Sequence, residues 1–220
     1  MQRISPSTEQ CKGQERESMP SSESSIIREI SESGARLRTE FFEANMDKIS
    51  HVSKTIAVRL VQGGKVLFCG NGGSAADCQH LAAEFVSRFR MERPPLPALA
   101  LTTDTSVLTA LGNDYGFEEL FSRQVKGLGG EGDVVVGIST SGKSANVIQA
   151  LQTAGEIGAY RIGLTGNRSG DIVEHSEAVF AVPSETTALI QEVHIALGHV
   201  ICRLMDYYLF EAVDELQKEL

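Results

Sequence analysis

The sequence predicts a three-layer α/β/α protein built on a five-stranded parallel sheet. From residue 26 onward, short apolar stretches of strand length alternate with longer stretches that have helical periodicity. Two loops rich in Gly and Ser directly follow apolar stretches, as expected where a parallel strand leads into a helix. The chain has 220 residues, 41% of them hydrophobic, which is enough to bury one core.

The N-terminal region is predicted to hold a polar tail and two helices. Residues 1–25 contain seven serines and two prolines but almost no large apolar side chains, so we expect a flexible tail. Apolar residues then recur at helical spacing from Ile26 to Phe42, and a second helix is expected from about Lys48 to Val61. We therefore expect a tail over 1–25 and a single domain over 26–215 that includes these helices.

Five strands and their connecting helices are expected after Gly63 and Gly64. The expected strands are Lys65–Cys69, Ala98–Leu101, Asp133–Ile138, Arg161–Leu164 and Ala178–Val182. The expected helices are Ser74–Arg90, Ser106–Leu111, Phe117–Leu128, Ser144–Gly158 and Thr187–Phe210. Because the strands are apolar throughout, helices should cover both faces of the sheet. Ligands of such sheets bind beyond the carboxyl ends of the strands.

Composition excludes several classes of function. There are 20 basic and 29 acidic residues, a net charge of −9, which argues against sequence-independent binding to nucleic acid. No uninterrupted apolar run approaches the roughly 18 residues of a membrane span, and no basic-then-apolar leader opens the chain. The four cysteines form no CxxC pair. We expect a reduced, cytoplasmic protein that binds neither membranes nor nucleic acid.

The loop Ser139–Ser144 is a candidate phosphate site. It follows a predicted strand and opens a predicted helix, whose first N–H groups and positive dipole end attract anions. Its hydroxyl groups can add further donors. The alternative is an ordinary turn with a serine helix cap. The stretch GISTSGKS (137–144) also matches the nucleotide-binding pattern GxxxxGK[ST], but no later strand ends in the Asp that would hold Mg²⁺, so a nucleotide triphosphatase is disfavoured.

The second loop, Gly70–Ser74, precedes a helix with titratable side chains. His80 and Glu84 are four residues apart and share one face of that helix, while Gln191 and His199 lie near one stripe of the last predicted helix. These four side chains could converge as a metal site or as an acid/base pair without metal. The remaining histidines of the domain are expected to be structural: His51, His175 and His194.

Four segments of the sequence resemble the sugar isomerase (SIS) domain family. They are CGNGGSAADCQHLAAEFVSRF (69–89), ALTTDTSVLTALGNDYGFEELFSRQV (100–125), GDVVVGISTSGKSANVI (132–148) and IQEVHIALGHVICRL (190–204). They occur in family order and cover nearly all of residues 40–210. The resemblance implies a flavodoxin-like fold and an aldose–ketose isomerase that converts sedoheptulose 7-phosphate to D-glycero-D-manno-heptose 7-phosphate. That reaction is an early step towards nucleotide-activated heptose for lipopolysaccharide core or another surface glycan.

The resemblance also implies roles for individual residues. The phosphate would be held by Ser139, Thr140, Ser141 and Ser144. The sugar chain would be lined by Gly72, Gly73, Ser74, Glu84, Asn113, Asp114 and Gln191, with Asp104 a weaker candidate. Glu84 and His199 would carry the proton transfers of an enediol mechanism. One Zn²⁺ per subunit would be held by His80, Glu84, Gln191 and His199, with no nucleotide cofactor.

Two further expectations concern assembly. The resemblance implies a homotetramer with active sites at subunit junctions. The family also contains a non-enzymatic branch, a tetrameric adaptor that binds a replication-initiator protein and lacks the acid/base residues. Because this chain has Glu84 and His199 in place, we favour the enzyme over the adaptor.

Overall fold

The computed structural model describes residues 22–167 and 170–216, which belong to two compact units that meet between Ser33 and Gly34. Helix α1 (Glu23–Val61) begins in the first unit and continues into the second. All other helices and strands belong to the second unit. Residues 1–21 of the predicted tail lie outside the described residues. Helix α1 begins at Glu23, three residues before the predicted start of the helical region at Ile26.

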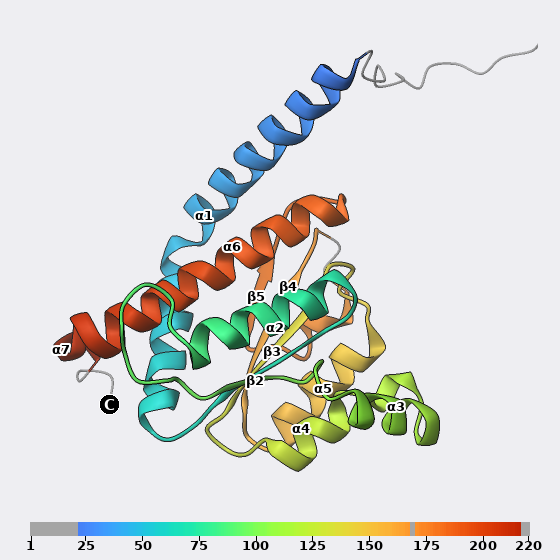
Figure 1. Cartoon of the computed structure of the whole chain (residues 1–220), viewed down its shortest axis with the longest axis vertical. Coiled ribbons are helices and arrows are strands. Elements are labelled where there is room, and N and C mark those ends of the chain that lie inside the picture. The colour runs from blue at the N-terminus through green and yellow to red at the C-terminus, as the bar shows by residue number, and fades with distance from the viewer. Residues whose placement is uncertain (1–21, 168–169, 217–220) are drawn as a thin grey trace, which may run out of the picture. The chain divides into compact units, whose positions relative to one another are not determined.

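The second unit contains one parallel sheet with the strand order β2-β1-β3-β4-β5 (Figure 1). The strands are β1 (Val66–Gly70), β2 (Ala98–Ala100), β3 (Val134–Ser139), β4 (Tyr160–Thr165) and β5 (Ala178–Ala181). This is the flavodoxin-like order, in which ligands bind where the direction of winding reverses, here between β1 and β3. The predicted five-stranded parallel sheet is confirmed, with each strand within two residues of its predicted ends.

Helices cover both faces of the sheet. They are α2 (Gly73–Val86), α3 (Thr105–Asp114), α4 (Ser122–Leu128), α5 (Ala145–Glu156), α6 (Thr187–Asp206) and α7 (Val213–Leu216). Single turns occur at Phe117–Glu119 and Asp171–Val173, and a π-helical turn follows α6 at Tyr207–Glu211. One buried cluster, which includes Phe85 and Leu197, packs α1, α2 and α6 on one face. A second, which includes Phe121 and Leu151, packs α4 and α5 on the other. The predicted three layers are confirmed.

The strand register places the two predicted binding loops side by side. Gly70 at the end of β1 pairs with Ile138, and Ser139 at the end of β3 pairs with Thr165 at the end of β4. The loops that follow β1 and β3 therefore leave the same edge of the sheet. This edge is the switch point at which ligands of such folds bind.

Three predicted element boundaries were wrong. The two N-terminal helices are one continuous helix, because no Gly or Pro lies between residues 42 and 48 and the Asn45 side chain folds back to donate to the Phe41 carbonyl at 2.8 Å. Helix α2 ends at Val86 rather than Arg90, where Ser87 leaves the helical conformation. The predicted helix over 117–128 is a short turn followed by α4.

One described helical stretch, Thr187–Glu211, is long and apolar enough to cross a membrane by length and composition alone. Half of its apolar window is buried inside the protein. Helix α6 is the core helix that packs against α2, and core helices of soluble folds meet the same criterion. The stretch is therefore accounted for by the packing of the domain.

Candidate active site

The loop Ser139–Ser144 gathers hydroxyl groups in front of helix α5. The Ser139 Oγ lies 2.9 Å from the Ser144 Oγ and 3.4 Å from the Ser141 Oγ. Gly142 has φ +66°, which lets the chain turn back tightly towards the helix. Ser144 is the residue before α5, but its side chain caps no helix N–H. The loop therefore does not form an ordinary serine cap. The hydroxyl groups of its serines remain grouped at the N-terminus of α5.

The match to the nucleotide-binding pattern starts inside the sheet. Gly137 is the fourth residue of β3, and a Cβ there would lie 2.8 Å from Val147 Cγ1 and 2.9 Å from Leu151 Cδ1. Glycine at this position therefore lets α5 pack closely on the sheet. It does not belong to a loop that wraps around phosphates, which removes the basis for the triphosphatase alternative.

A cavity of about 270 Å³ opens beside this loop. Its lining residues are Thr140, Ser141, Lys143, Asn167, Ser184, Glu185, Thr187 and Ile190. Asn167 and Ser184, which follow β4 and β5, were not identified from the sequence. The rule that ligands bind beyond strand ends would have found both. Lys143 lines the same cavity, on the side of the candidate phosphate site.

The loop after β1 is tied to the phosphate loop's helix. The Asn71 and Asn146 side chains donate to each other's oxygens at 2.8 and 2.9 Å. Gly72 has φ +56° at the start of α2. A Cβ at Gly73 would lie 2.5 Å from the Gln191 side-chain nitrogen, so the Gln191 side chain of α6 packs directly against α2 at this glycine. Ser74 is buried in the first turn of α2.

Further along these helices, His80 and Glu84 of α2 meet His199 of α6. The two imidazole Nε2 atoms are 2.9 Å apart, and His80 Nε2 lies 3.4 Å from Glu84 Oε1. One ligand atom from each residue lies within 4.8 Å of the other two. We call these three residues the triad. The neighbours of His80 and His199 show how closely α2 and α6 pack here. Leu81 follows His80, Gly198 precedes His199, and a Cβ at Gly198 would lie 2.6 Å from Leu81 Cδ1.

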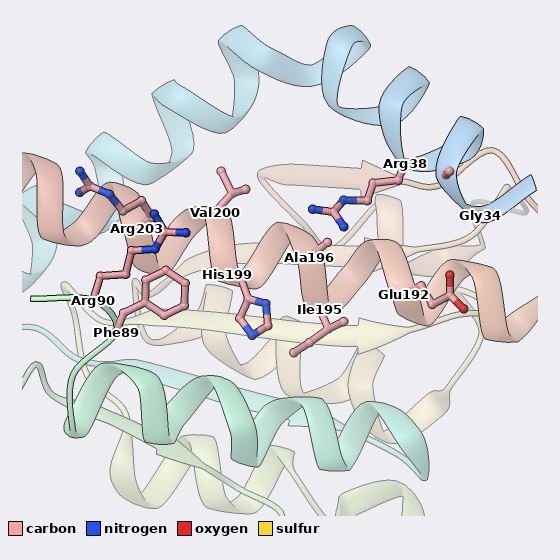
Figure 2. A pocket seen from close by; sticks show the side chains of 11 residues that line it. Gly34, Arg38, Phe89, Arg90, Glu192, Ile195, Ala196, His199, Val200 and Arg203 are labelled. Atoms are coloured by element: carbon pink, nitrogen blue, oxygen red, sulfur yellow. The ribbon is translucent and has the colours of Figure 1, made fainter. Parts of the chain in front are cut away.

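The surroundings of His199 favour its neutral form. Burial lowers the pKa of this imidazole, and the neighbouring His80 and the Arg38 guanidinium lower it further, against the opposing effect of Glu84. The Phe89 ring stacks against the imidazole at 5.7 Å. A neutral imidazole can accept a proton or bind a metal, and Figure 2 shows that of His199 directed from α6 towards α2.

The triad can hold a metal ion. Two imidazole nitrogens and one carboxylate oxygen form a donor set that suits Zn²⁺, and catalytic zinc sites use three protein ligands with one open position. His199 also faces a groove of about 590 Å³, shown in Figure 2, that would give a small molecule access. The groove is lined by Gly34, Ala35, Arg38, Phe89, Arg90, Glu192, Ile195, Ala196, His199, Val200 and Arg203.

Three candidate residues lie apart from these contacts. Asn113 and Asp114 end α3, are exposed and bond to each other at 2.7 Å. Within the described residues, no hydrogen bond or ion pair joins them to the triad or to the phosphate loop. Asp104 caps α3, because its Oδ1 accepts from the Val107 N–H at 3.0 Å. Asp104 therefore has a structural role that accounts for its presence.

Of the other histidines, His194 has a clear structural role. Its side chain is buried, and its Nε2 donates to the Thr165 carbonyl at 3.1 Å. Burial lowers its pKa to about 4. His175 bonds to Gln152 at 2.9 Å, and His51 is exposed on α1. No described contact brings any of the three to the triad.

The sheet order and the loops at its carboxyl edge define a flavodoxin-like α/β domain with a candidate anion site, and the SIS domain family matches residues 31–166. The chain therefore belongs to the SIS domain family. It is 57% identical to the phosphoheptose isomerase of Maridesulfovibrio salexigens over 86% of this chain and 92% of that protein. Within the family, the chain is thus similar to phosphoheptose isomerases.

Solved structures agree with this assignment. A phosphoheptose isomerase from Neisseria gonorrhoeae is 44% identical and superposes with a TM-score of 0.78 over 83% of this chain and 98% of its own. One from Francisella tularensis is 38% identical, with a TM-score of 0.81 over 84% of this chain and 98% of its own. The fold and family expected from the sequence are confirmed.

Proposed function

We propose that this protein is an aldose–ketose isomerase that converts sedoheptulose 7-phosphate to D-glycero-D-manno-heptose 7-phosphate. The observation that carries the proposal is the meeting of Glu84 and His199 from separate helices, in a chain whose loop of hydroxyls marks a phosphate site. The high identity to proteins named phosphoheptose isomerase supports the choice of substrate.

The interconversion requires a proton to leave one carbon and return to its neighbour. Glu84 removes a proton from carbon 1 of the ketose, and the electrons of that C–H bond form the double bond of an enediol. The same carboxyl group returns a proton to carbon 2, which gives the aldose. His199 moves the proton between the two oxygens, because its neutral ring can both accept and donate one.

The phosphate end of the substrate is assigned to the loop after β3. Ser139, Thr140, Ser141 and Ser144 donate to the phosphate oxygens together with the first N–H groups of α5. The sugar chain runs along Gly72, Gly73, Ser74, Asn113, Asp114 and Gln191. The contact between Gln191 and Gly73 supports this path for the loop after β1, whereas the exposed positions of Asn113 and Asp114 leave them as proposals from the family resemblance.

Zinc is the proposed metal, one ion per subunit, with His80, Glu84, Gln191 and His199 as its ligands. The convergence of three of these side chains supports the site. Gln191 lies against Gly73, two helical turns before His80 along α2, so its role as the fourth ligand stays a proposal from the family resemblance. A bound ion would polarise the substrate's oxygens, and a zinc-bound Glu84 would have to leave the ion before it acts as the base. No nucleotide cofactor is part of the proposal.

The proposed assembly is a homotetramer with active sites at subunit junctions. Three isoleucines at helical spacing on α1 are 45 to 70% exposed, namely Ile26, Ile27 and Ile30, and they offer an apolar surface for contact. The proposed location is the cytoplasm, where the product would enter the synthesis of nucleotide-activated heptose for lipopolysaccharide core or another surface glycan. The free, buried Cys69, Cys78 and Cys202 fit a reducing compartment.

The adaptor alternative gains nothing from the site or from the relatives named above. Turnover tests the choice between the two. Purified protein is incubated with sedoheptulose 7-phosphate before and after chelation, and the aldoheptose phosphate is followed by NMR. Turnover lost on chelation and restored by Zn²⁺ supports the enzyme with a catalytic metal. Turnover that survives chelation supports a metal-free pair of Glu84 and His199, and no turnover in either case refutes the isomerase.

A further inference from the structure

A buried ion pair lies at one end of the candidate active site. The Arg93 Nε donates to Asp206 Oδ1 at 2.8 Å, and both side chains are 1% exposed. Among the described residues, the only buried Asp, Glu, Lys or Arg side chains are those of Arg93, Asp133 and Asp206. Burial of charge is costly unless every polar group is bonded, so a pair of this kind calls for a physical explanation.

The remaining nitrogens of Arg93 bind the end of helix α2. Its Nη2 donates to the Glu84 carbonyl at 2.9 Å, and its Nη1 donates to the Phe85 carbonyl at 2.9 Å and the Pro94 carbonyl at 3.1 Å. The last carbonyls of a helix have no partner within the helix. Arg93 therefore caps α2 through the main chain of Glu84, the residue proposed as the catalytic base.

Asp206 joins this cap to α6, the helix that carries His199. It is the last residue of α6 and lies seven residues, about two turns, after His199, so both face the same side of the helix. Its second oxygen accepts from the Arg90 N–H at 3.3 Å. Arg90 and Arg93 each bond one oxygen of the Asp206 carboxylate. These bonds fix the end of α6 against the segment that follows α2.

Helices α2 and α6 run in the same direction and touch at three successive levels. Gly73 meets Gln191 at the first level, and Leu81 meets Gly198 at the second. At the third level, Asp206 meets Arg93, which is bonded to the last turn of α2. The triad lies at the second level and extends towards the third, because His80 and His199 are next to Leu81 and Gly198 and Glu84 follows one turn later. Its geometry therefore depends on the ion pair that closes the far end.

We propose that Arg93 is a positioning residue, which holds Glu84 opposite His199 by bonding the Glu84 main chain and Asp206 at the same time. Its effect on turnover rests on the proposed function. A guanidinium group is needed because its planar fork reaches three carbonyls and a carboxylate together. A lysine in its place keeps the charge opposite Asp206 but cannot present that fork.

The test compares Arg93→Lys with a matched control, Asp133→Asn. Asp133 is the other buried carboxylate. It pairs at 2.7 Å with the Nζ of Lys65, whose side chain is 37% exposed, and accepts from the Lys65 and Gly130 N–H groups. It precedes β3 at the end of the sheet opposite the site. The control therefore removes a buried charge from a residue that does not contact α2 or α6. Both variants are measured as full chains for melting temperature, kcat and KM with sedoheptulose 7-phosphate.

We expect Arg93→Lys to lower kcat at least tenfold while KM changes less than twofold, because Arg93 does not contact the phosphate loop. Asp133→Asn should lower the melting temperature at least as much and leave kcat within twofold of the parent. The proposal is overturned if Arg93→Lys keeps its kcat, or if kcat falls in both variants in proportion to lost stability. If Arg93→Lys does not fold, Asp206→Asn takes its place with the same expectations.

A second readout needs no turnover. The affinity for Zn²⁺ alone is measured by competition with a chromophoric chelator, and Arg93→Lys should bind at least tenfold more weakly than the parent while Asp133→Asn binds equally. Equal affinity in all three chains would overturn the proposal. A parent chain that binds Zn²⁺ but does not isomerise sedoheptulose 7-phosphate refutes the proposed function, and the zinc affinities then decide the role of Arg93.

Discussion

At the scale of single residues, the sequence predicted some contacts of the candidate site and missed others. Ser144 stands at a helix start, where serine normally caps an N–H, yet its hydroxyl bonds to Ser139 instead. His80 and Glu84 were expected to share a helix face, and they do. The contact of His199 with these two residues depends on how α2 packs against α6. No local pattern in the sequence predicts that packing.

Ser144→Ala should chiefly weaken substrate binding. A hydrogen bond to a charged group contributes about 1.5–3 kcal/mol, so we expect KM for sedoheptulose 7-phosphate to rise roughly 10- to 100-fold with kcat nearly unchanged. The phosphate is bound in both the ground state and the transition state, which is why kcat should be spared. Steady-state kinetics check this. A large loss of kcat at unchanged KM would show that the loop acts in the chemical step.

His194 should make stability depend on pH. Its pKa is lowered in the folded protein from 6.5 to about 4, so the unfolded chain binds the proton more tightly. The stabilisation is fully present above pH 6.5 and is lost as the pH falls from 6.5 towards 4, to a total of about 3 kcal/mol. Urea unfolding at pH 7.5 and 4.5 measures the loss. His194→Gln, which keeps a donor for the Thr165 carbonyl, should lose clearly less over this range, and an equal loss would contradict the assignment.

At the scale of secondary-structure elements, the strands were predicted well because each is a short apolar run bounded by Gly, Pro or polar residues. Helix boundaries were harder. The predicted break between residues 42 and 48 is absent, because Asn45 continues the helix by bonding to the turn before it. The predicted end of α2 at Arg90 was four residues too late, because the chain leaves the helix at Ser87 and Arg93 caps the last turn.

The close packing of α2 and α6 gives an element-scale prediction. Gly198→Ala places a Cβ against Leu81, whose side chain is itself buried, so the helices must separate or the core must rearrange. We expect a loss of about 1–3 kcal/mol in the free energy of unfolding and a clear loss of turnover. Gly127→Ala in α4 is the control, because a Cβ there meets nothing within 4 Å and should be neutral or slightly stabilising. Equal stability of the two variants would show that the close approach is not required.

At the scale of the whole molecule, the sheet order, the loops at its carboxyl edge and the family were all predictable from the sequence. Alternation of strands and helices fixes which ends of the strands share an edge, so the two binding loops had to meet. The exposed position of Asn113 and Asp114 could not be foreseen, because it depends on where α3 packs. Their proposed role in binding the sugar is one that a second subunit could complete.

Sedimentation tests the proposed assembly. The aliphatic stripe of α1 that includes Ile26, Ile27 and Ile30 should be covered by contact between subunits. We expect a single tetrameric species at micromolar concentration, and Ile27→Asp together with Ile30→Asp should shift it to smaller species. A monomeric profile of the unchanged protein would contradict the tetramer.

The central claim is that Glu84, held opposite His199, carries out proton transfer on a heptose phosphate. The most direct measurement compares the unchanged protein with Glu84→Gln for NMR-followed conversion of sedoheptulose 7-phosphate, with substrate binding measured on the same samples. The account predicts conversion by the unchanged protein. It predicts a loss of at least about 100-fold in kcat for the variant, with substrate still bound, because shape and phosphate contacts survive without the base. Near-equal rates for the two, or no conversion by either, would contradict it.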